Sequence, residues 1–490
     1  MLENSLLRND PERSLRRAGD SPSIADNTVT LLRDGPKVFA SWLEDIGNAR
    51  RFILFENYIF RSDRIGHKIA EALCKRAQDG LEVYVLFDWL GSLGTSRSLW
   101  VKMQRAGVRV RAFGSFHLTD PLRLLTRNHR KVMCVDGNIG HVGGLCVGDP
   151  WAGNPDRGLA PWRDTAVRFE GPAALQLCQA FDETWSEAGS PLPDRIRFAE
   201  PVSASGPDFP PSERPSEDTP CCQVPVRVIS GLPGRSRIYR LTQVLLTNAT
   251  SRIFITDAYF LTPPLMYEAL TSAARDGVDV RVLVPGRSDI PWIAWASRAG
   301  YVGLLQAGVR IFEWQGPMLH AKTTVVDGRY CRVGSSNLNL ASLLTNWELD
   351  VVIEDPTFGQ AAEQMFLSDL TQTRELQLRK RRVRAVGSPK TDQTAAAPVA
   401  GRARAAVVQA GAAVLGVALR RRYERSPFSV AIVAALVLLG LGAFGLLFPQ
   451  LFGLGLSALC VWFGVGALLR GLADFHTTRR SKKKRRSPTS

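Results

Sequence analysis

The chain carries a long internal repeat, and this repeat constrains its fold more than any other feature. EALCKRAQDGLEVYVLF begins at Glu71 and EALTSAARDGVDVRVLV begins at Glu268, and each reads as an amphipathic helix, an Asp-Gly turn and a buried strand. Further along, WRDTAVRFEGP aligns with NWELDVVIEDP, which places Asp164 opposite Glu348. A repeat of this length predicts one α/β unit used twice, as suits 490 residues, too many for a single hydrophobic core.

We therefore expect an α/β fold with two pseudo-twofold related domains, each a mixed sheet covered by helices. Changes in composition mark the segments around them. The expected parts are a flexible N-terminal arm at 1–27, a first domain at 28–200, a Pro/Ser-rich linker at 201–222, a second domain at 223–376, and a basic linker at 377–426 whose alanine-rich stretch suits a membrane interface.

The C-terminal region is strongly apolar. Ser429–Phe448 and Leu451–Leu469 are two almost uncharged runs, each near the roughly 20 residues that cross a bilayer as a helix. Arginine and lysine clusters flank both ends, which by the positive-inside rule places both ends in the cytoplasm. We expect a transmembrane helical hairpin at 427–470 and a basic cytoplasmic tail at 471–490, with a buried soluble helix pair as the alternative.

Two of the six histidines begin the same pattern. The patterns consist of His129, Lys131 and Asp136, and of His320, Lys322 and Asp327. In each, the histidine and lysine are two positions apart in a strand-like run, so that both side chains point to one face of a sheet. The Asp-Gly pair that follows predicts a hairpin turn.

These residues resemble the phospholipase D superfamily, whose HxKxxxxD motif, followed by a small-residue G(G/S)xN, appears here twice. FENYIFRSD, FDWLGS and DAYFLTP are similar to segments of the shorter bacterial cardiolipin synthases. The resemblance covers roughly residues 28 to 376. It implies a phosphatidyltransferase of the inner (cytoplasmic) membrane, multi-pass, with catalytic domains and both termini in the cytoplasm.

The resemblance also implies roles for the motif residues. One histidine, His129, attacks phosphorus to form a phosphohistidine, and His320 protonates the leaving alcohol, although the pseudo-symmetry leaves the reverse assignment open. The lysines bind the phosphoryl oxygens, and the motif aspartates are either catalytic or turn formers. The further expected residues are Gly144, Ser335, Ser336 and Asn337 for substrate binding, and Asp164 and Glu348 for orienting the histidines.

The first motif departs from the family pattern. Cys146 stands where the family has asparagine, whereas Asn337 fills that place in the second motif. The loss of one amide donor weakens phosphate binding by about 1 kcal/mol, less than the loss of a lysine would. We therefore expect an asymmetric but active site.

The favoured reaction converts two phosphatidylglycerol molecules into cardiolipin and glycerol. The net charge of +16 suits phosphatidylglycerol and other anionic phospholipids as partners. We expect no cofactor, no metal and no nucleic acid, since two histidines suffice and the eight cysteines form no zinc-type cluster. The alternatives are a phospholipase D hydrolase or an exchange enzyme with another acceptor, a nuclease of the same superfamily, and a non-catalytic membrane scaffold. The oligomeric state stays open.

Overall fold

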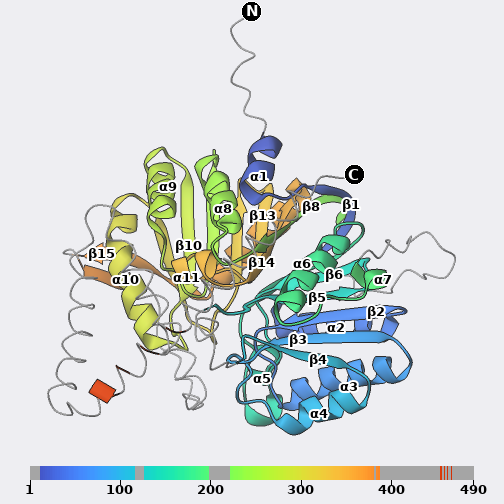
Figure 1. The fold of residues 1–490 in the computed structure, drawn as a ribbon. Coiled ribbons are helices and arrows are strands. Elements are labelled where there is room, and N and C mark those ends of the chain that lie inside the picture. The colour runs from blue at the N-terminus through green and yellow to red at the C-terminus, as the bar shows by residue number, and fades with distance from the viewer. Residues whose placement is uncertain are drawn as a thin grey trace, which may run out of the picture. The chain divides into compact units, whose positions relative to one another are not determined.

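The computed structural model describes residues 11–115, 126–197, 221–379 and 382–386, with isolated positions from 453 to 465 (Figure 1). Apart from those positions, the hairpin expected at 427–470 lies outside the described residues. Within the described ranges, no helix is both long and apolar enough to span a bilayer. The chain divides into two units, residues 1–113 with 128–405 and residues 114–127 with 406–490, and the fold below belongs to the first.

Both copies of the repeat contribute strands to one sheet. The first copy supplies β1 (Ile24–Arg33), β2 (Phe52–Asn57), β3 (Glu82–Asp88), β4 (Arg109–Phe113), β5 (Lys131–Val135), β6 (Ile139–Gly143) and β7 (Thr165–Glu170). The second supplies β8 (Cys221–Gly231), β9 (Arg252–Asp257), β10 (Asp279–Pro285), β11 (Arg310–Trp314), β12 (Lys322–Val326), β13 (Tyr330–Gly334), β14 (Glu348–Glu354), β15 (Thr373–Arg379) and β16 (Arg382–Val386).

The strand order is the same in the two halves. It runs β1-β7-β6-β5-β2-β3-β4 in the first and β8-β14-β13-β12-β9-β10-β11 in the second, with β15 and β16 added beyond β11. The pairs within β2-β3-β4 and within β9-β10-β11 are parallel, and the others are antiparallel. The expected mixed α/β architecture is confirmed. The sheet is continuous, however, because β1 pairs with β8 and joins the two halves.

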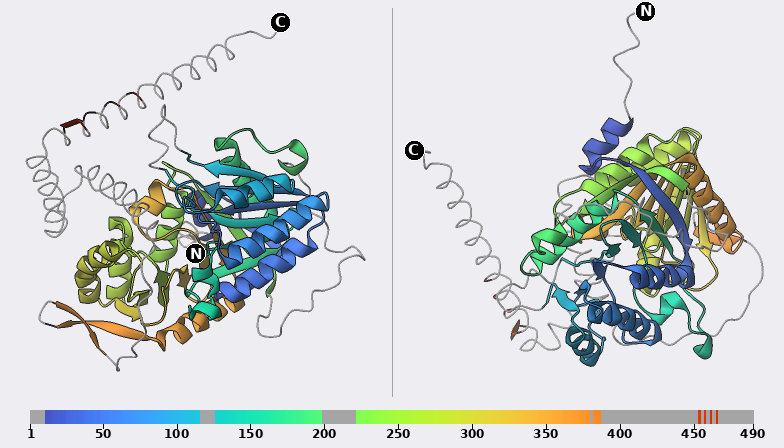
Figure 2. Two further views of the ribbon diagram at one scale, coloured as in Figure 1. Left: turned by 90° about the horizontal axis from the view of Figure 1, so that it is seen from below. Right: turned by 90° about the vertical axis from the view of Figure 1, so that its right-hand side faces the viewer.

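Helices cover both faces of this sheet (Figure 2). In chain order they are α2 (Asp34–Asn48), α3 (Arg64–Gln78), α4 (Arg97–Arg105), α5 (Asp149–Ala152), α6 (Ala174–Glu187), α7 (Asp194–Arg197), α8 (Arg237–Thr247), α9 (Pro264–Arg275), α10 (Pro291–Gln306), α11 (Leu340–Leu344) and α12 (Pro356–Leu370). One core packs α6 and α12 against strand residues such as Leu54 and Phe254. Neighbouring residues point to the opposite face of the sheet. There Ile53 packs with residues of α2, α3 and α4, and Ile253 packs with residues of α8 and α9.

Part of the segment that we expected to be a flexible arm is ordered. Residues Pro11–Gly19 form the helix α1, and its Leu15 is buried in the same cluster as residues of α8. Glu12 forms an ion pair with Arg227, and the hydroxyl of Ser21 donates to the carbonyl of Val228 at 2.7 Å. The polar composition of this segment hid the few apolar residues that pack it.

The Asp-Gly turns after β5 and β12 are built alike. Asp136 and Gly137 have φ of 56° and 75°, and Asp327 and Gly328 have φ of 53° and 62°, as a type I′ hairpin turn requires. The Asp136 carboxylate accepts the backbone N–H groups of residues 50, 51 and 52 at 2.7 to 2.9 Å. Asp327 does the same for residues 250 to 252. Each aspartate therefore fastens its turn to the start of the neighbouring strand.

We predict that Asp136→Ala lowers the free energy of unfolding by about 3 kcal/mol, because it leaves three backbone donors without their acceptor and because alanine tolerates the positive φ less well than aspartate. Asp136→Asn keeps an oxygen acceptor and tolerates this φ, and should lose clearly less. Thermal and urea unfolding of the two variants measure the difference. An alanine variant as stable as the parent would contradict this structural role.

Candidate active site

The backbone N–H of each motif histidine donates a hydrogen bond to the other half of the fold. The N–H of His129 donates to the carbonyl of Trp347 at 2.8 Å, and that of His320 donates to the carbonyl of Arg163 at 2.7 Å. Short parallel bridges at Asn128 and at Arg163 accompany these bonds. The residue after each acceptor is the carboxylate that the repeat had aligned.

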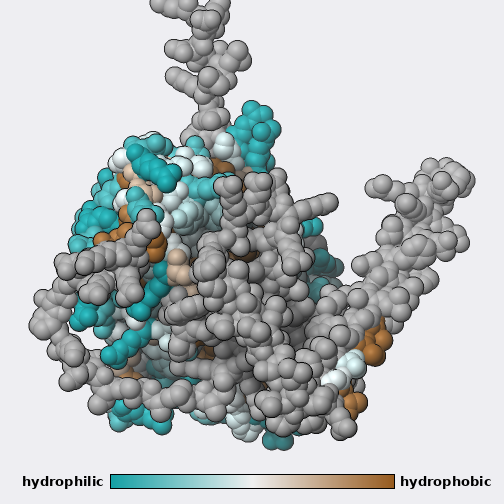
Figure 3. All heavy atoms as spheres, turned by 90° about the vertical axis from the view of Figure 1, so that its left-hand side faces the viewer, coloured by the Kyte–Doolittle hydropathy of each residue, from teal (hydrophilic) through white to brown (hydrophobic). Residues whose placement is uncertain are grey.

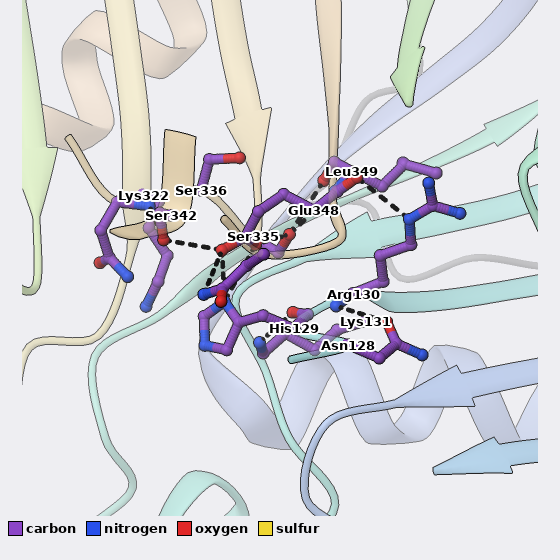
Figure 4. A network of polar contacts seen from close by, with 12 residues as sticks. Asn128, His129, Arg130, Lys131, Lys322, Ser335, Ser336, Ser342, Glu348 and Leu349 are labelled. Carbon is purple, nitrogen blue, oxygen red and sulfur yellow. Dashed lines mark hydrogen bonds and ion pairs between the residues drawn. The ribbon is translucent and has the colours of Figure 1, made fainter. Parts of the chain in front are cut away.

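The two histidines are consequently paired with carboxylates across the halves. The Nδ1 of His129 lies 2.9 and 3.0 Å from the carboxylate oxygens of Glu348 (Figure 4), and the Nδ1 of His320 lies 2.8 Å from Asp164. All four side chains are buried. At His129, a carboxylate at Nδ1 favours the tautomer that carries its proton there, which leaves Nε2 free to act as nucleophile or base. The Nδ1 of His320 lies 3.0 Å from the Lys322 ammonium as well. This geometry fits the orienting role expected of Asp164 and Glu348.

Two residues expected to bind substrate, Ser335 and Gly144, contact the carboxylates. Ser335 donates its hydroxyl to Glu348, as does Ser342 at 2.7 Å (Figure 4). Gly144 lies against Asp164, and a Cβ there would come within 2.2 Å of a carboxylate oxygen. The small-residue motif thus makes room for one carboxylate and hydrogen-bonds the other.

The other two expected substrate-binding residues keep polar atoms available. The backbone N–H of Ser336 donates to Asp350 at 3.1 Å and that of Asn337 donates to Ser342 at 3.3 Å. The Ser336 hydroxyl and the side-chain oxygen Oδ1 of Asn337 are buried without a hydrogen-bond partner in the described structure. These atoms remain candidates for contact with substrate.

The motif lysines lie beside the histidines. Each donates to its own histidine's carbonyl, Lys131 to His129 and Lys322 to His320. The lysine ammonium groups also face aromatic rings, at 5.2 Å from Tyr58 and 5.9 Å from Tyr259. Both tyrosines come from the segments that resembled cardiolipin synthases.

Burial and neighbouring charges set the protonation states of the site. Burial and then the charge of Lys322 lower the pKa of His320 to about 3, and burial lowers the pKa of His129 as well. Burial also lowers the pKa of Lys322 to about 8 and that of Lys131 below its usual range. The charge of each lysine acts on the histidine of the other motif, so both motifs form one site. Both histidines are neutral at pH 7.

The surroundings of the two histidines differ. The ring of His320 lies 5.6 Å from Trp151, 5.8 Å from Trp162 and 6.2 Å from Tyr259. The ring of His129 contacts Tyr58 at 4.9 Å. The first motif has the buried thiol of Cys146, near both lysines, where the second has Asn337. Burial raises the pKa of this thiol, so the thiol stays protonated.

The motif aspartates do not reach the histidines. Asp136 and Asp327 follow the far ends of β5 and β12, which at five residues each extend about 16 Å. Their carboxylates face the backbone groups described above. Of our two interpretations, this geometry fits the turn-forming one, and a catalytic part for Asp136 and Asp327 stays a prediction.

Two buried arginines that the sequence analysis did not single out, Arg130 and Arg163, hydrogen-bond the backbone of the two carboxylate residues. The guanidinium of Arg130 donates to the backbone carbonyl of Glu348 at 3.1 Å, and that of Arg163 donates to the backbone carbonyl of Asp164. Arg163 also binds Asp369 of α12 at 2.7 Å. The repeat gave no signal for Arg130, since Ala321 occupies its place in the second motif. No cluster of three or more metal-ligating side chains occurs among the residues that the structure describes.

Comparison with known proteins gives a consistent answer. A family model described as "Cardiolipin synthase, PLD-like domain" matches residues 42–149 and 243–370. Cardiolipin synthase A of Pseudomonas putida (strain W619) is 34% identical over 367 residues, 74% of this chain and 73% of the relative. Cardiolipin synthase A of Pseudomonas aeruginosa (strain LESB58) is 34% identical over 372 residues, 76% of this chain and 72% of the relative.

Among solved structures, phosphatidylserine synthase of Haemophilus influenzae Rd KW20 matches with a TM-score of 0.56 at 15% identity, over 75% of this chain and 92% of that one. At this identity the match shows a shared fold. The identity to the Pseudomonas proteins, together with the doubled histidine and lysine site, shows the family. The chain belongs to the phospholipase D superfamily and is a cardiolipin synthase-like phospholipid enzyme.

Proposed function

We propose that this enzyme transfers a phosphatidyl group from one phosphatidylglycerol to a hydroxyl of a second, forming cardiolipin and releasing glycerol. The observation that carries the proposal is the pair of neutral histidines, each held at Nδ1 by a carboxylate of the other half, beside two buried lysines. Sequence identity of about a third to cardiolipin synthases supports this choice of substrate class.

In the first step, Nε2 of His129 attacks phosphorus, a P–N bond forms and the P–O bond to glycerol breaks. The departing oxygen takes a proton from His320, whose protonated form the entering phosphodiester anion favours. The lysines neutralise the non-bridging oxygens, assisted by the Ser336 hydroxyl. The three aromatic rings around His320 keep bulk water from this proton.

In the second step, His320 takes the proton of the acceptor hydroxyl, whose oxygen attacks phosphorus as the P–N bond breaks. One phosphodiester replaces another, so the reaction requires no energy-rich cofactor. We place the enzyme at the cytoplasmic side of the inner membrane, where phosphatidylglycerol is both donor and acceptor.

The first test uses mass spectrometry of lipids after incubation of the full-length protein with phosphatidylglycerol vesicles and EDTA. The parent protein should give cardiolipin and glycerol, and His129→Asn and His320→Asn should give neither. A phosphorylated histidine trapped on the parent enzyme identifies the nucleophile by its position. Phosphatidic acid alone would show a hydrolase, and an unchanged lipid pool would refute the proposal.

Glu348→Gln should lower kcat by roughly 10³-fold, because an amide no longer stabilises the imidazolium or enforces the tautomer. Glu354→Gln, at the other end of β14 and paired with Arg227, is the matched control and should keep kcat. Steady-state rates of glycerol release measure both. Equal losses in the two variants would mean damage to β14 rather than to the histidine.

The profile of kcat/KM against pH should fall above pH 8. Lys322 binds phosphate only as a cation, and it loses its proton as the pH rises through its lowered pKa of about 8. Below that pH the lysine is charged, so the profile should be level towards neutrality. An alkaline limb near pH 10, the usual range for lysine, would contradict the buried environment.

A further inference from the structure

The first half exposes one large apolar side chain beside the active site. Leu93 is 45% exposed, whereas nearly all large apolar side chains described between residues 11 and 386 are buried or half-buried. It lies in loop 89–96, which connects β3 to α4 (Figure 1). Trp89 and Leu90 in this loop are half-buried, so the loop presents an apolar tip.

Loop 89–96 packs against Tyr58, whose ring contacts His129. Gly91 lies so close to Tyr58 that a Cβ would come within 2.8 Å of the ring. The hydroxyl of Ser92 bonds the backbone at Tyr58 and Phe60, at 3.3 and 3.0 Å. The ring of Tyr58 contacts His129. Whatever the loop tip touches is therefore close to the nucleophile.

The backbone of this loop supplies its own hydrogen-bond partners. The N–H groups of residues 90 and 91 donate to the Asp88 carboxylate, and those of 92, 93 and 95 donate to carbonyls within 88–92. The N–H of Ser96 donates to the hydroxyl of Ser62 at 3.1 Å. Backbone donors that are satisfied internally can enter an apolar phase without a desolvation penalty. The donors of residues 90–93, 95 and 96 meet this condition.

The charges around the tip suit an anionic surface. Residues 89–101 contain no acidic side chain, and Arg97 is exposed at the start of α4. Basic residues near an anionic leaflet attract it, and tryptophan is favoured at the lipid headgroup level.

We infer that loop 89–96 docks the first half on an anionic phospholipid bilayer by inserting Leu93 into the interface. A donor lipid then passes along the loop to Tyr58 and His129 without leaving the membrane. This inference rests on the proposed action on phospholipids and adds a docking site on the catalytic domain itself, separate from any C-terminal anchor.

Leu265 provides a matched control. It is 46% exposed, but it lies at the start of α9 in a groove with Glu268 and Asp276, and these acidic groups would be repelled by anionic lipid. In Figure 3, the described surface is mostly hydrophilic, with small separate hydrophobic patches. The two leucines thus match in type and exposure and differ in charge environment.

The experiment compares glycerol release by full-length Leu93→Asp, Leu265→Asp and parent protein. One substrate is phosphatidylglycerol in mixed phosphatidylethanolamine vesicles, and the other is monomeric dihexanoylphosphatidylglycerol. Leu93→Asp should lose about tenfold on vesicles, the value of one buried leucine, and keep the parent rate on the monomeric lipid. Leu265→Asp should keep both rates. A parent-like vesicle rate for Leu93→Asp, or equal losses on both substrates, would overturn the inference.

A second measurement is independent of catalysis. With Cys221, Cys222 and Cys460 replaced by serine, Leu93→Cys carries an environment-sensitive fluorophore, and Leu265→Cys carries it in the control. A blue shift at position 93 alone, on addition of phosphatidylglycerol vesicles, supports docking even where the parent protein releases no glycerol and the proposed reaction fails. The absence of any shift at position 93 overturns docking whatever the activity.

Discussion

Two backbone hydrogen bonds between the halves, from His129 to Trp347 and from His320 to Arg163, determine the geometry of the whole site. Since the residue after each acceptor is a buried carboxylate, one bond in the main chain places that carboxylate at Nδ1 of the histidine. Neither half by itself pairs its motif histidine with a carboxylate. Separation of the halves would leave two buried carboxylates without their partners, so assembly of the sheet and of the site are energetically coupled.

The charges of the site are balanced until substrate arrives. Burial alone would raise the pKa of Glu348 and Asp164, but the histidines and lysines beside them lower it, so both stay ionised. Two lysine cations face these two carboxylates, and the histidines are neutral. A phosphodiester anion therefore enters a site that can protonate a histidine in response. The same desolvation that lowers the pKa of the histidines strengthens their interaction with the developing charge.

The sequence predicted each half well, because a repeat reports what is shared between two copies. Both histidines, both lysines and the aligned pair Asp164 and Glu348 were predicted from it, as was the mixed α/β architecture. It could not predict the pairing of β1 with β8 or the exchange of carboxylates, because contacts between copies leave no periodic pattern. The motif aspartates were ambiguous for another reason. The same aspartate can form an Asp-Gly turn or act as a catalytic carboxylate. Only the direction of its side chain in the structure distinguishes the two roles.

Three departures from the repeat lie within or just after the two motifs. When the two motifs are aligned, Gly144 corresponds to Ser335, Cys146 to Asn337 and Arg130 to Ala321. In the proposed phosphatidyl transfer, one histidine carries the phosphoryl group, and the other exchanges protons with two alcohols in turn. Equal environments would suit neither task, and the aromatic enclosure of His320 and the doubly hydrogen-bonded Glu348 at His129 fit the division that we propose. The pseudo-twofold fold supplies two equivalent positions, and the unmatched residues make them unequal.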